Sequence, residues 1–204
     1  MRCRSNPRPR CRPDGGGDRT FMTQSPTEKG PQLKTLVVYE SMFGNTEQIA
    51  NAVAAGLGES VDVQVAEVAD APTDPSPDVA LIVAGGPTHA FSMSRENTRT
   101  DAISKGAHEG EREFGLREWI AALSSGDHTE KMATFDTKIK SMRHLPGSAA
   151  KSAAKAAHRH GYQSLSKAES FCVEDIDGPL LDGEIDRARA WGRQLAASMT
   201  KTVT

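Results

Sequence analysis

The stretch Leu33-Lys34-Thr35-Leu36-Val37-Val38-Tyr39 decides the fold class, because its apolar, β-branched run is typical of a strand buried on both faces. A loop of small and polar residues follows over 41–46. Apolar residues then recur at helical spacing from Ile49 to Leu57, and Gly58 ends this predicted helix. A buried strand followed directly by a helix is the repeating unit of an α/β protein.

The remainder of the chain repeats this unit. Further strands are predicted at residues 61–65, 79–84, 132–135 and 170–173, and further helices at 116–123, 148–160 and 182–195. Apolar strands separated by helices predict a doubly wound, five-stranded parallel sheet covered on both sides. Five strands favour the order 2-1-3-4-5 over the nucleotide-binding order, with ligands bound outside the carboxyl ends of the strands near Tyr39, Ala84 and Phe135.

Composition excludes several classes of protein. The 204 residues are 37% hydrophobic and 25% charged, which is usual for a globular domain with its own core. The longest apolar run, Val79 to Ala84, is far below the roughly 20 residues of a membrane-spanning helix. The formal charge of −2 argues against a nucleic-acid partner. Cys3, Cys11 and Cys172 fit neither a zinc site nor a disulfide framework, so we expect no metal and a reducing, cytoplasmic location.

The first thirty residues differ from the rest of the chain. They are rich in Arg, Pro and Gly, with little apolar periodicity. We therefore expect residues 1–32 to form a disordered basic tail and residues 33–200 to form the folded domain. Three roles remain open for the tail: none, an arm that binds nucleic acid or a membrane surface, or a targeting segment. Met22 is an alternative start of translation.

The first loop, residues 40–47, leads from a strand into the N-terminus of a helix, whose free N–H groups and dipole attract an anion. Ser41, Asn45 and Thr46 add side-chain donors, and Gly44 permits a close backbone approach. The loop contains no Lys or Arg, whereas a triphosphate loop needs a Lys. The pattern favours one phosphate monoester; an ordinary helix cap is the alternative.

This loop resembles the phosphate loop of the flavodoxin family, whose pattern after the first strand is Ser/Thr-x-Thr-Gly-x-Thr. Ser41, Gly44 and Thr46 match it, whereas Phe43 stands where the family usually has Thr and so removes one hydroxyl. The resemblance implies that the phosphate lies among Ser41, Met42, Phe43, Gly44, Asn45 and Thr46.

The second loop, Gly85-Gly86-Pro87-Thr88-His89, resembles the family's Gly-x-Pro-Thr-Tyr segment, which runs beside the isoalloxazine ring. This implies contacts from Pro87, Thr88 and His89, with His89 or Phe91 stacking on the ring. A Gly-Pro turn that merely ends a strand is the alternative.

The third loop matches the family only loosely. Phe135, Asp136 and Thr137 occupy the place of the loop that covers the other face of the flavin and meets the ribityl chain. Asp136 is either a hydrogen-bond acceptor or a turn residue.

The resemblance covers roughly residues 34–197. It implies an FMN-binding flavodoxin-like protein that transfers electrons or reduces a quinone-type acceptor, with a reductase or a quinone-like small molecule as partner. Phe43 keeps a second hypothesis open, namely a binding module of the same fold that lacks FMN or binds another flavin or a deazaflavin. A dinucleotide fingerprint is absent, as is the phosphoacceptor Asp of a response-regulator receiver.

Residues 88–111 are polar and mixed in charge, with little periodicity. Long irregular loops in compact domains are usually functional or disordered. We expect this segment to be a mobile lid over the flavin, with a solvated surface excursion as the alternative.

Overall fold

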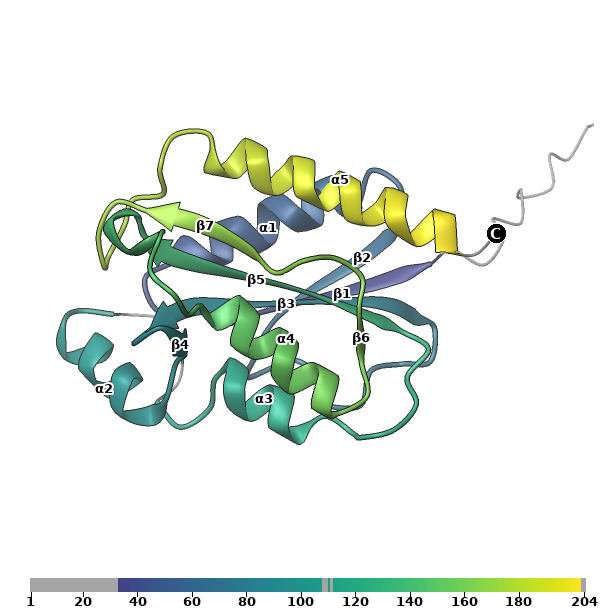
Figure 1. The fold of residues 1–204 in the computed structure, drawn as a ribbon, viewed down its shortest axis with the longest axis horizontal. Coiled ribbons are helices and arrows are strands. Elements are labelled where there is room, and N and C mark those ends of the chain that lie inside the picture. Colours follow the sequence, from purple (N-terminus) through teal and green to yellow (C-terminus); the bar gives the residue numbers. More distant parts are fainter. Residues whose placement is uncertain (1–32, 108–109, 111, 203–204) are drawn as a thin grey trace, which may run out of the picture. The chain divides into compact units, whose positions relative to one another are not determined.

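The computed structural model describes residues 33–107, 110 and 112–202 (Figure 1). The tail predicted for residues 1–32 lies outside the described residues. Within the described part, no helix combines the length and the apolar character needed to cross a membrane.

A parallel sheet in the order β2-β1-β3-β5 forms the centre of the domain, and both β6 and β7 pair with the outer side of β5. Its main strands are β1 (Lys34–Tyr39), β2 (Asp62–Glu67), β3 (Val79–His89), β5 (Lys131–Ile139) and β7 (Glu169–Val173). This arrangement confirms the predicted doubly wound sheet and its 2-1-3-4-5 order. One short strand, β4 (Ser92–Met93), adds an antiparallel hairpin to β3.

The outer strand is broken in two. β6 (Gln163–Ser164) pairs with Lys131 and Met132, whereas β7 pairs with Phe135 to Ile139. The chain departs from the sheet between these two pieces. The sequence predicts only the second piece, because two exposed polar residues carry no strand pattern.

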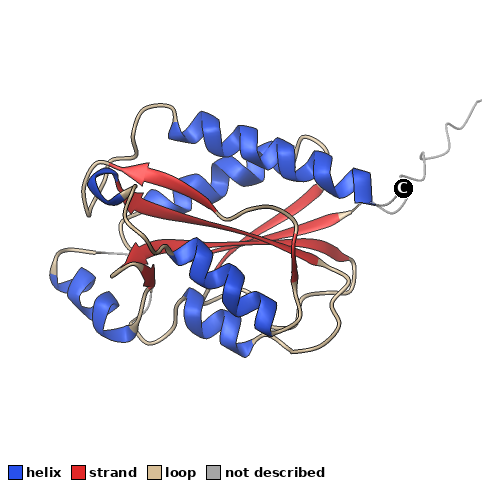
Figure 2. Cartoon of the chain, viewed as in Figure 1, coloured by secondary structure: helices blue, strands red, loops and turns tan. Residues whose placement is uncertain are grey.

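Helices cover both faces of the sheet (Figures 1 and 2). One face carries α1 (Asn45–Leu57) and α5 (Glu184–Thr202), which pack against each other. The other face carries α3 (Leu116–Ala122) and α4 (Ala149–Arg159). A short α2 (Glu96–Ser104) lies near the carboxyl ends of the strands, and one 3-10 turn, η1 (Lys140–Met142), follows β5.

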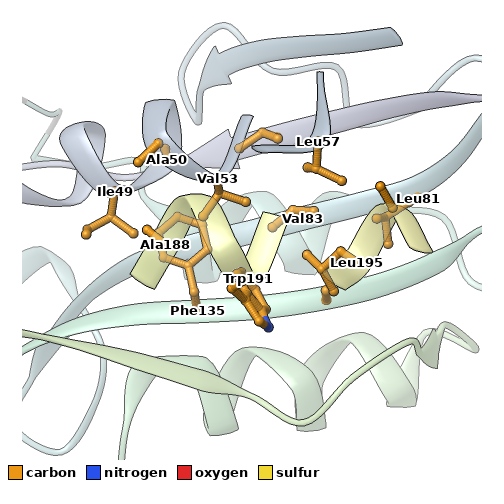
Figure 3. Close-up of a cluster of buried hydrophobic side chains, with 14 of the residues drawn as sticks. Ile49, Ala50, Val53, Leu57, Leu81, Val83, Phe135, Ala188, Trp191 and Leu195 are labelled. Carbon is orange, nitrogen blue, oxygen red and sulfur yellow. The ribbon is translucent and has the colours of Figure 1, made fainter. Parts of the chain in front are cut away.

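Each face of the sheet has its own apolar core, as expected for strands buried on both sides. On the first face, side chains of α1 and α5 meet over Val83 and Phe135 (Figure 3). Phe135 packs edge-on against Trp191, with the ring centroids 6.2 Å apart. On the second face, Trp119 of α3 is fully buried.

Two predictions about the segment after residue 84 are wrong. The strand predicted to end at Ala84 continues to His89, because Gly85, Gly86 and Pro87 pair with the long β5 strand. The described part of residues 88–111 is not irregular throughout, since it contains β4 and α2. α2 escapes a search for apolar periodicity because its two buried residues are Arg99 and Ala102.

Candidate functional site

A pocket of about 280 Å³ opens at the carboxyl ends of the strands, where the sheet order places a ligand. Five segments of the chain supply its walls. They are the start of α1 (Met42, Phe43, Asn45, Thr46), the β3–β4 hairpin (Pro87, Thr88, His89, Ala90), α2 and its C-cap (Thr98, Asp101, Ala102, Lys105), the end of β5 with η1 (Thr137, Lys138, Ile139, Met142), and the segment around the end of β7 (Val173, Ile176).

The N-terminus of α1 points its first N–H groups toward this end of the sheet. Gly44 precedes the helix with a φ of 77°, a left-handed conformation that suits glycine, and no described side chain caps the helix. Ser41 instead turns inward, and its Oγ accepts a hydrogen bond from the Gly44 N–H at 3.1 Å. The helix terminus is therefore open to an anion.

Two threonine hydroxyls join this helix to β5. Thr46 Oγ1 and Thr137 Oγ1 lie 2.8 Å apart and are buried. The two hydroxyls carry two protons, and their mutual bond uses one. The pair therefore retains one O–H donor, and both residues line the pocket.

Asp136 organises the neighbouring wall without facing the pocket. Its Oδ2 accepts from the Thr88 hydroxyl at 2.9 Å and from the Ala150 N–H at 2.9 Å. Thr88 Oγ1 in turn accepts from the Ala149 N–H at 2.9 Å. Of the two roles that the sequence leaves open for Asp136, the structure shows the acceptor, and the donors belong to the protein.

The β3–β4 hairpin turns through Ala90 and Phe91, whose φ angles are 45° and 65°. A two-residue hairpin with both φ angles positive normally uses Asn and Gly, so alanine and phenylalanine are strained here. The turn leaves Phe91 49% exposed, outside the pocket wall, whereas His89 lines the pocket. Burial lowers the pKa of His89, so its imidazole is neutral at pH 7.

Arg99 anchors α2, and the sequence analysis overlooked it. Its side chain is fully buried; Nη1 donates to Ser94 Oγ at 2.9 Å and lies 3.1 Å from Glu118 Oε2. Its Nε donates to the Arg112 carbonyl at 2.7 Å. A guanidinium thus takes the place that an apolar side chain usually occupies in a helix.

Glu40, the first residue of the first loop, shares this buried cluster. Its Oε2 accepts from the Leu116 N–H at 2.8 Å, and burial raises the pKa of its carboxyl while Arg99 opposes the rise. Gly115 allows the close approach, because a Cβ there would lie 2.6 Å from Arg99 Nη1 and 2.8 Å from Glu40 Oε2. The cluster ties α2 to the residue that begins the first loop.

Two lysines face the pocket from opposite walls. Lys138 is 7% exposed, and its Nζ donates to the Gly147 carbonyl at 3.1 Å. Lys105 is half exposed and pairs with Asp101 at 2.7 Å. The amines lie outside the first loop, so the N-terminus of α1 keeps neutral donors only.

The structure brings eight of the thirteen predicted site residues together in the pocket wall. They are Met42, Phe43, Asn45, Thr46, Pro87, Thr88, His89 and Thr137. The other five lie elsewhere: Ser41 and Gly44 shape the first loop, Phe91 lies on the hairpin turn, Asp136 holds α4, and Phe135 belongs to the core (Figure 3).

The family model for flavodoxin matches residues 37–145, which is more than half of the chain. The chain belongs to the flavodoxin family. Membership places it among flavin-binding redox proteins in general. Comparison with curated proteins gives no significant match.

Solved flavodoxin structures share the fold at low sequence identity. A flavodoxin from the domain Archaea is 20% identical, with a TM-score of 0.57 over 82% of this chain and 99% of that one. The flavodoxin of Streptococcus pneumoniae TIGR4 is 18% identical, with a TM-score of 0.55 over 80% and 98%. A short-chain flavodoxin associated with a PDU bacterial microcompartment is 16% identical, with a TM-score of 0.56 over 84% and 99%.

Three parts of the pocket of this flavodoxin were not predicted from its sequence: α2, the basic side of β5 with η1, and the end of β7. The α2 residues leave no apolar pattern. Lys138 directly follows Thr137 of the third loop at the end of a central strand, and this position was its signal in the sequence. Val173 and Ile176 follow from the topology, because β7 ends at the same edge of the sheet.

Proposed function

We propose that this flavodoxin binds FMN in the pocket and transfers electrons between a reductase and an acceptor. The observation that carries the proposal is the uncapped N-terminus of α1 at one end of a pocket with mainly apolar walls. An open helix terminus suits a phosphate, and the apolar slot suits a flat aromatic ring.

The phosphate end is assigned to backbone N–H groups and the paired hydroxyls of Thr46 and Thr137. The spare O–H of that pair would donate to a phosphate or ribityl oxygen. The side chain of Asn45 is less available to a phosphate, because its Nδ2 already donates to the Asp177 carbonyl at 3.0 Å. Phe43 lines the pocket in place of the family's hydroxyl, so the site has one donor fewer.

The ring end is assigned to the hairpin and α2. His89 offers a neutral imidazole, and Ala102 offers a small apolar contact on the α2 side. A bound flavin supplies the redox chemistry, while the protein positions it and sets its electrostatics. Lys138 holds a positive charge in the wall, and among the described residues one of its three N–H donors has a partner.

Absorbance of the purified protein tests the proposal. We expect a flavin spectrum, and FMN as the small molecule released on denaturation. A deazaflavin spectrum would favour the alternative binding module, and protein that stays colourless in excess FMN would exclude the proposal.

Titration of the apoprotein with FMN and with riboflavin tests the phosphate assignment. Loss of charge-assisted hydrogen bonds worth roughly 1.5–3 kcal/mol should make riboflavin bind at least about tenfold more weakly than FMN. Equal affinities would contradict a phosphate site at α1.

A further inference from the structure

The stretch from residue 137 to residue 168 contains no Asp or Glu, although the whole chain has a formal charge of −2. Six of its basic side chains are exposed: Lys140, Arg143, Lys151, Lys155, Arg159 and Lys167. We call the five from Lys140 to Arg159 the basic face. It occupies the turn after β5 and the outer side of α4.

The sequence of α4 separates the two sides of the helix. Ala149, Ala150, Ala153 and Ala157 are buried against the sheet. Lys151, Lys155 and Arg159 are exposed and recur every four residues, so they lie along one side of the helix. With a rise of about 1.5 Å per residue, the row from Lys151 to Arg159 is about 12 Å long.

The charges of this row are not neutralised within the described part of the chain. None of Lys151, Lys155 and Arg159 forms an ion pair with a described carboxylate, and Glu118 on the adjacent α3 pairs with Arg99 instead. Like charges four residues apart destabilise a helix by a few tenths of a kcal/mol per pair. The mutual repulsion within the row is therefore not offset by a described carboxylate, so the row is free to attract a negatively charged partner.

The basic face begins at the pocket. Lys138, Ile139 and Met142 line the pocket, and the basic side chains of the turn lie next to them in sequence. Figure 1 shows that α4 starts at this same end of the sheet, beside β4. Met142 and Leu145 are 39% and 46% exposed among these charges. Apolar side chains surrounded by polar ones are the usual anatomy of a protein interface.

From these observations we propose that the basic face docks an acidic protein that exchanges electrons with the ligand of the pocket. The identity of the partner as a redox protein rests on the proposed function. Interfaces of electron-transfer encounters are small, and complementary charge accelerates their formation.

A protein suits this surface better than a long polyanion. Charge interactions in solution fade over about 8 Å at physiological salt, so a compact partner responds to the local positive charge. A nucleic acid would extend past a row of about 12 Å onto a molecule of net negative charge.

The first experiment measures electron transfer from the reduced, FMN-loaded protein to two cytochromes of the c type, one acidic and one basic. The variant K151E/K155E/R159E reverses the row. The control K34E/R189E/R193E makes the same change in net charge at exposed positions away from α4. We expect the acidic cytochrome to react faster, with a rate that falls as salt rises. The row variant should lose about tenfold of this rate at low salt, and the control should lose little. Preference for the basic cytochrome, or equal losses in both variants, would overturn the proposal.

The second experiment needs no flavin and so separates this proposal from the proposed function. Binding of fluorescein-labelled poly-L-glutamate is followed by anisotropy, with a single-stranded RNA of equal charge as comparison. We expect wild type and control to bind polyglutamate and the row variant to lose binding. The milder K151Q/K155Q/R159Q variant covers the case in which three reversals impair folding. Equal binding by all variants, no binding, or tighter binding of RNA through the same residues would reject an acidic protein partner. A colourless protein that still binds polyglutamate through the row would refute the FMN assignment and leave the docking surface standing.

Discussion

The two walls that meet across the pocket are built on opposite principles. The first loop and the start of α1 use backbone groups, small residues and neutral hydroxyls. The α2 wall depends on a buried guanidinium, Arg99, and on the carboxylate of Glu40. The first wall is therefore tied to the backbone conformation of one turn, whereas the second is tied to charges brought together from distant parts of the chain.

This difference has an energetic consequence. A wall made from backbone groups tolerates the loss of one side chain, because each hydrogen bond contributes only about 1 kcal/mol net. A buried ion cluster fails abruptly, because removing one partner leaves the other charge buried without compensation. Substitutions in the two walls should therefore differ in kind: the first should change ligand affinity, and the second should change stability.

Replacing Arg99 should have the largest effect. R99M would remove the buried cation that pairs with Glu118 and offsets the burial of the Glu40 carboxyl, and we expect the free energy of unfolding to fall by about 3–5 kcal/mol. Urea denaturation measures this loss. R95M changes an exposed arginine of the same segment and should cost less than about 0.5 kcal/mol. A loss below about 1 kcal/mol for R99M would show that the α2 wall does not depend on the ion cluster.

Thr46 tests the first wall. T46A removes one member of the hydroxyl pair at the start of α1, and FMN affinity should fall about ten- to a hundredfold. T46S keeps the hydroxyl and should bind nearly as wild type. Fluorescence titration gives the affinities, and unchanged binding by T46A would remove Thr46 from the phosphate site.

Phe43 tests the same wall with a substitution that should strengthen FMN binding rather than weaken it. F43T restores the hydroxyl of the family pattern, and one added hydrogen bond of about 1 kcal/mol should tighten FMN binding about fivefold. F43V matches the shape without the hydroxyl and should show no such gain. If valine and threonine give the same affinity, packing rather than a missing donor governs this position.

His89 gives the smallest effect, which appears only with pH. Burial lowers its pKa in the folded state, so the unfolded chain binds a proton first as pH falls below about 6.5. Its contribution to stability is complete above that pH and is lost as pH falls through the folded-state pKa. H89Q should therefore flatten the fall in melting temperature between about pH 7 and pH 5. Parallel pH curves for variant and wild type would contradict a half-buried, neutral imidazole.

The first wall could be predicted from the sequence, and the second could not, for the same physical reason. A strand, a Gly-containing turn and an amphipathic helix are local patterns, so β1, the first loop and α1 appear in the sequence at their correct places. Arg99 and Glu40 are 59 positions apart. Nothing local to either residue shows that it is buried, and a polar helix with a buried arginine has the pattern of a loop.

Phe135 illustrates a second limit of prediction from sequence. It stands at the carboxyl end of a central strand, where a ligand contact is expected, but successive residues of a strand face opposite sides of the sheet, so residues 135 and 137 share one side. Phe135 faces the core beside Trp191, and Thr137 lines the pocket two positions later, where the strand extends beyond the core. The predicted strand ended at residue 135, so this further extension was not visible.

The interrupted outer strand has a consequence for association between copies of the chain. A long, straight strand at the edge of a sheet is a template on which another chain can add a strand. Here that edge consists of two residues in β6 and five in β7, with a departure from the sheet between them. The break shortens the template that this edge offers to a second chain, independently of what the pocket binds. The opposite edge, β2, is unbroken over six residues, so of the two edges it is the better template for an added strand.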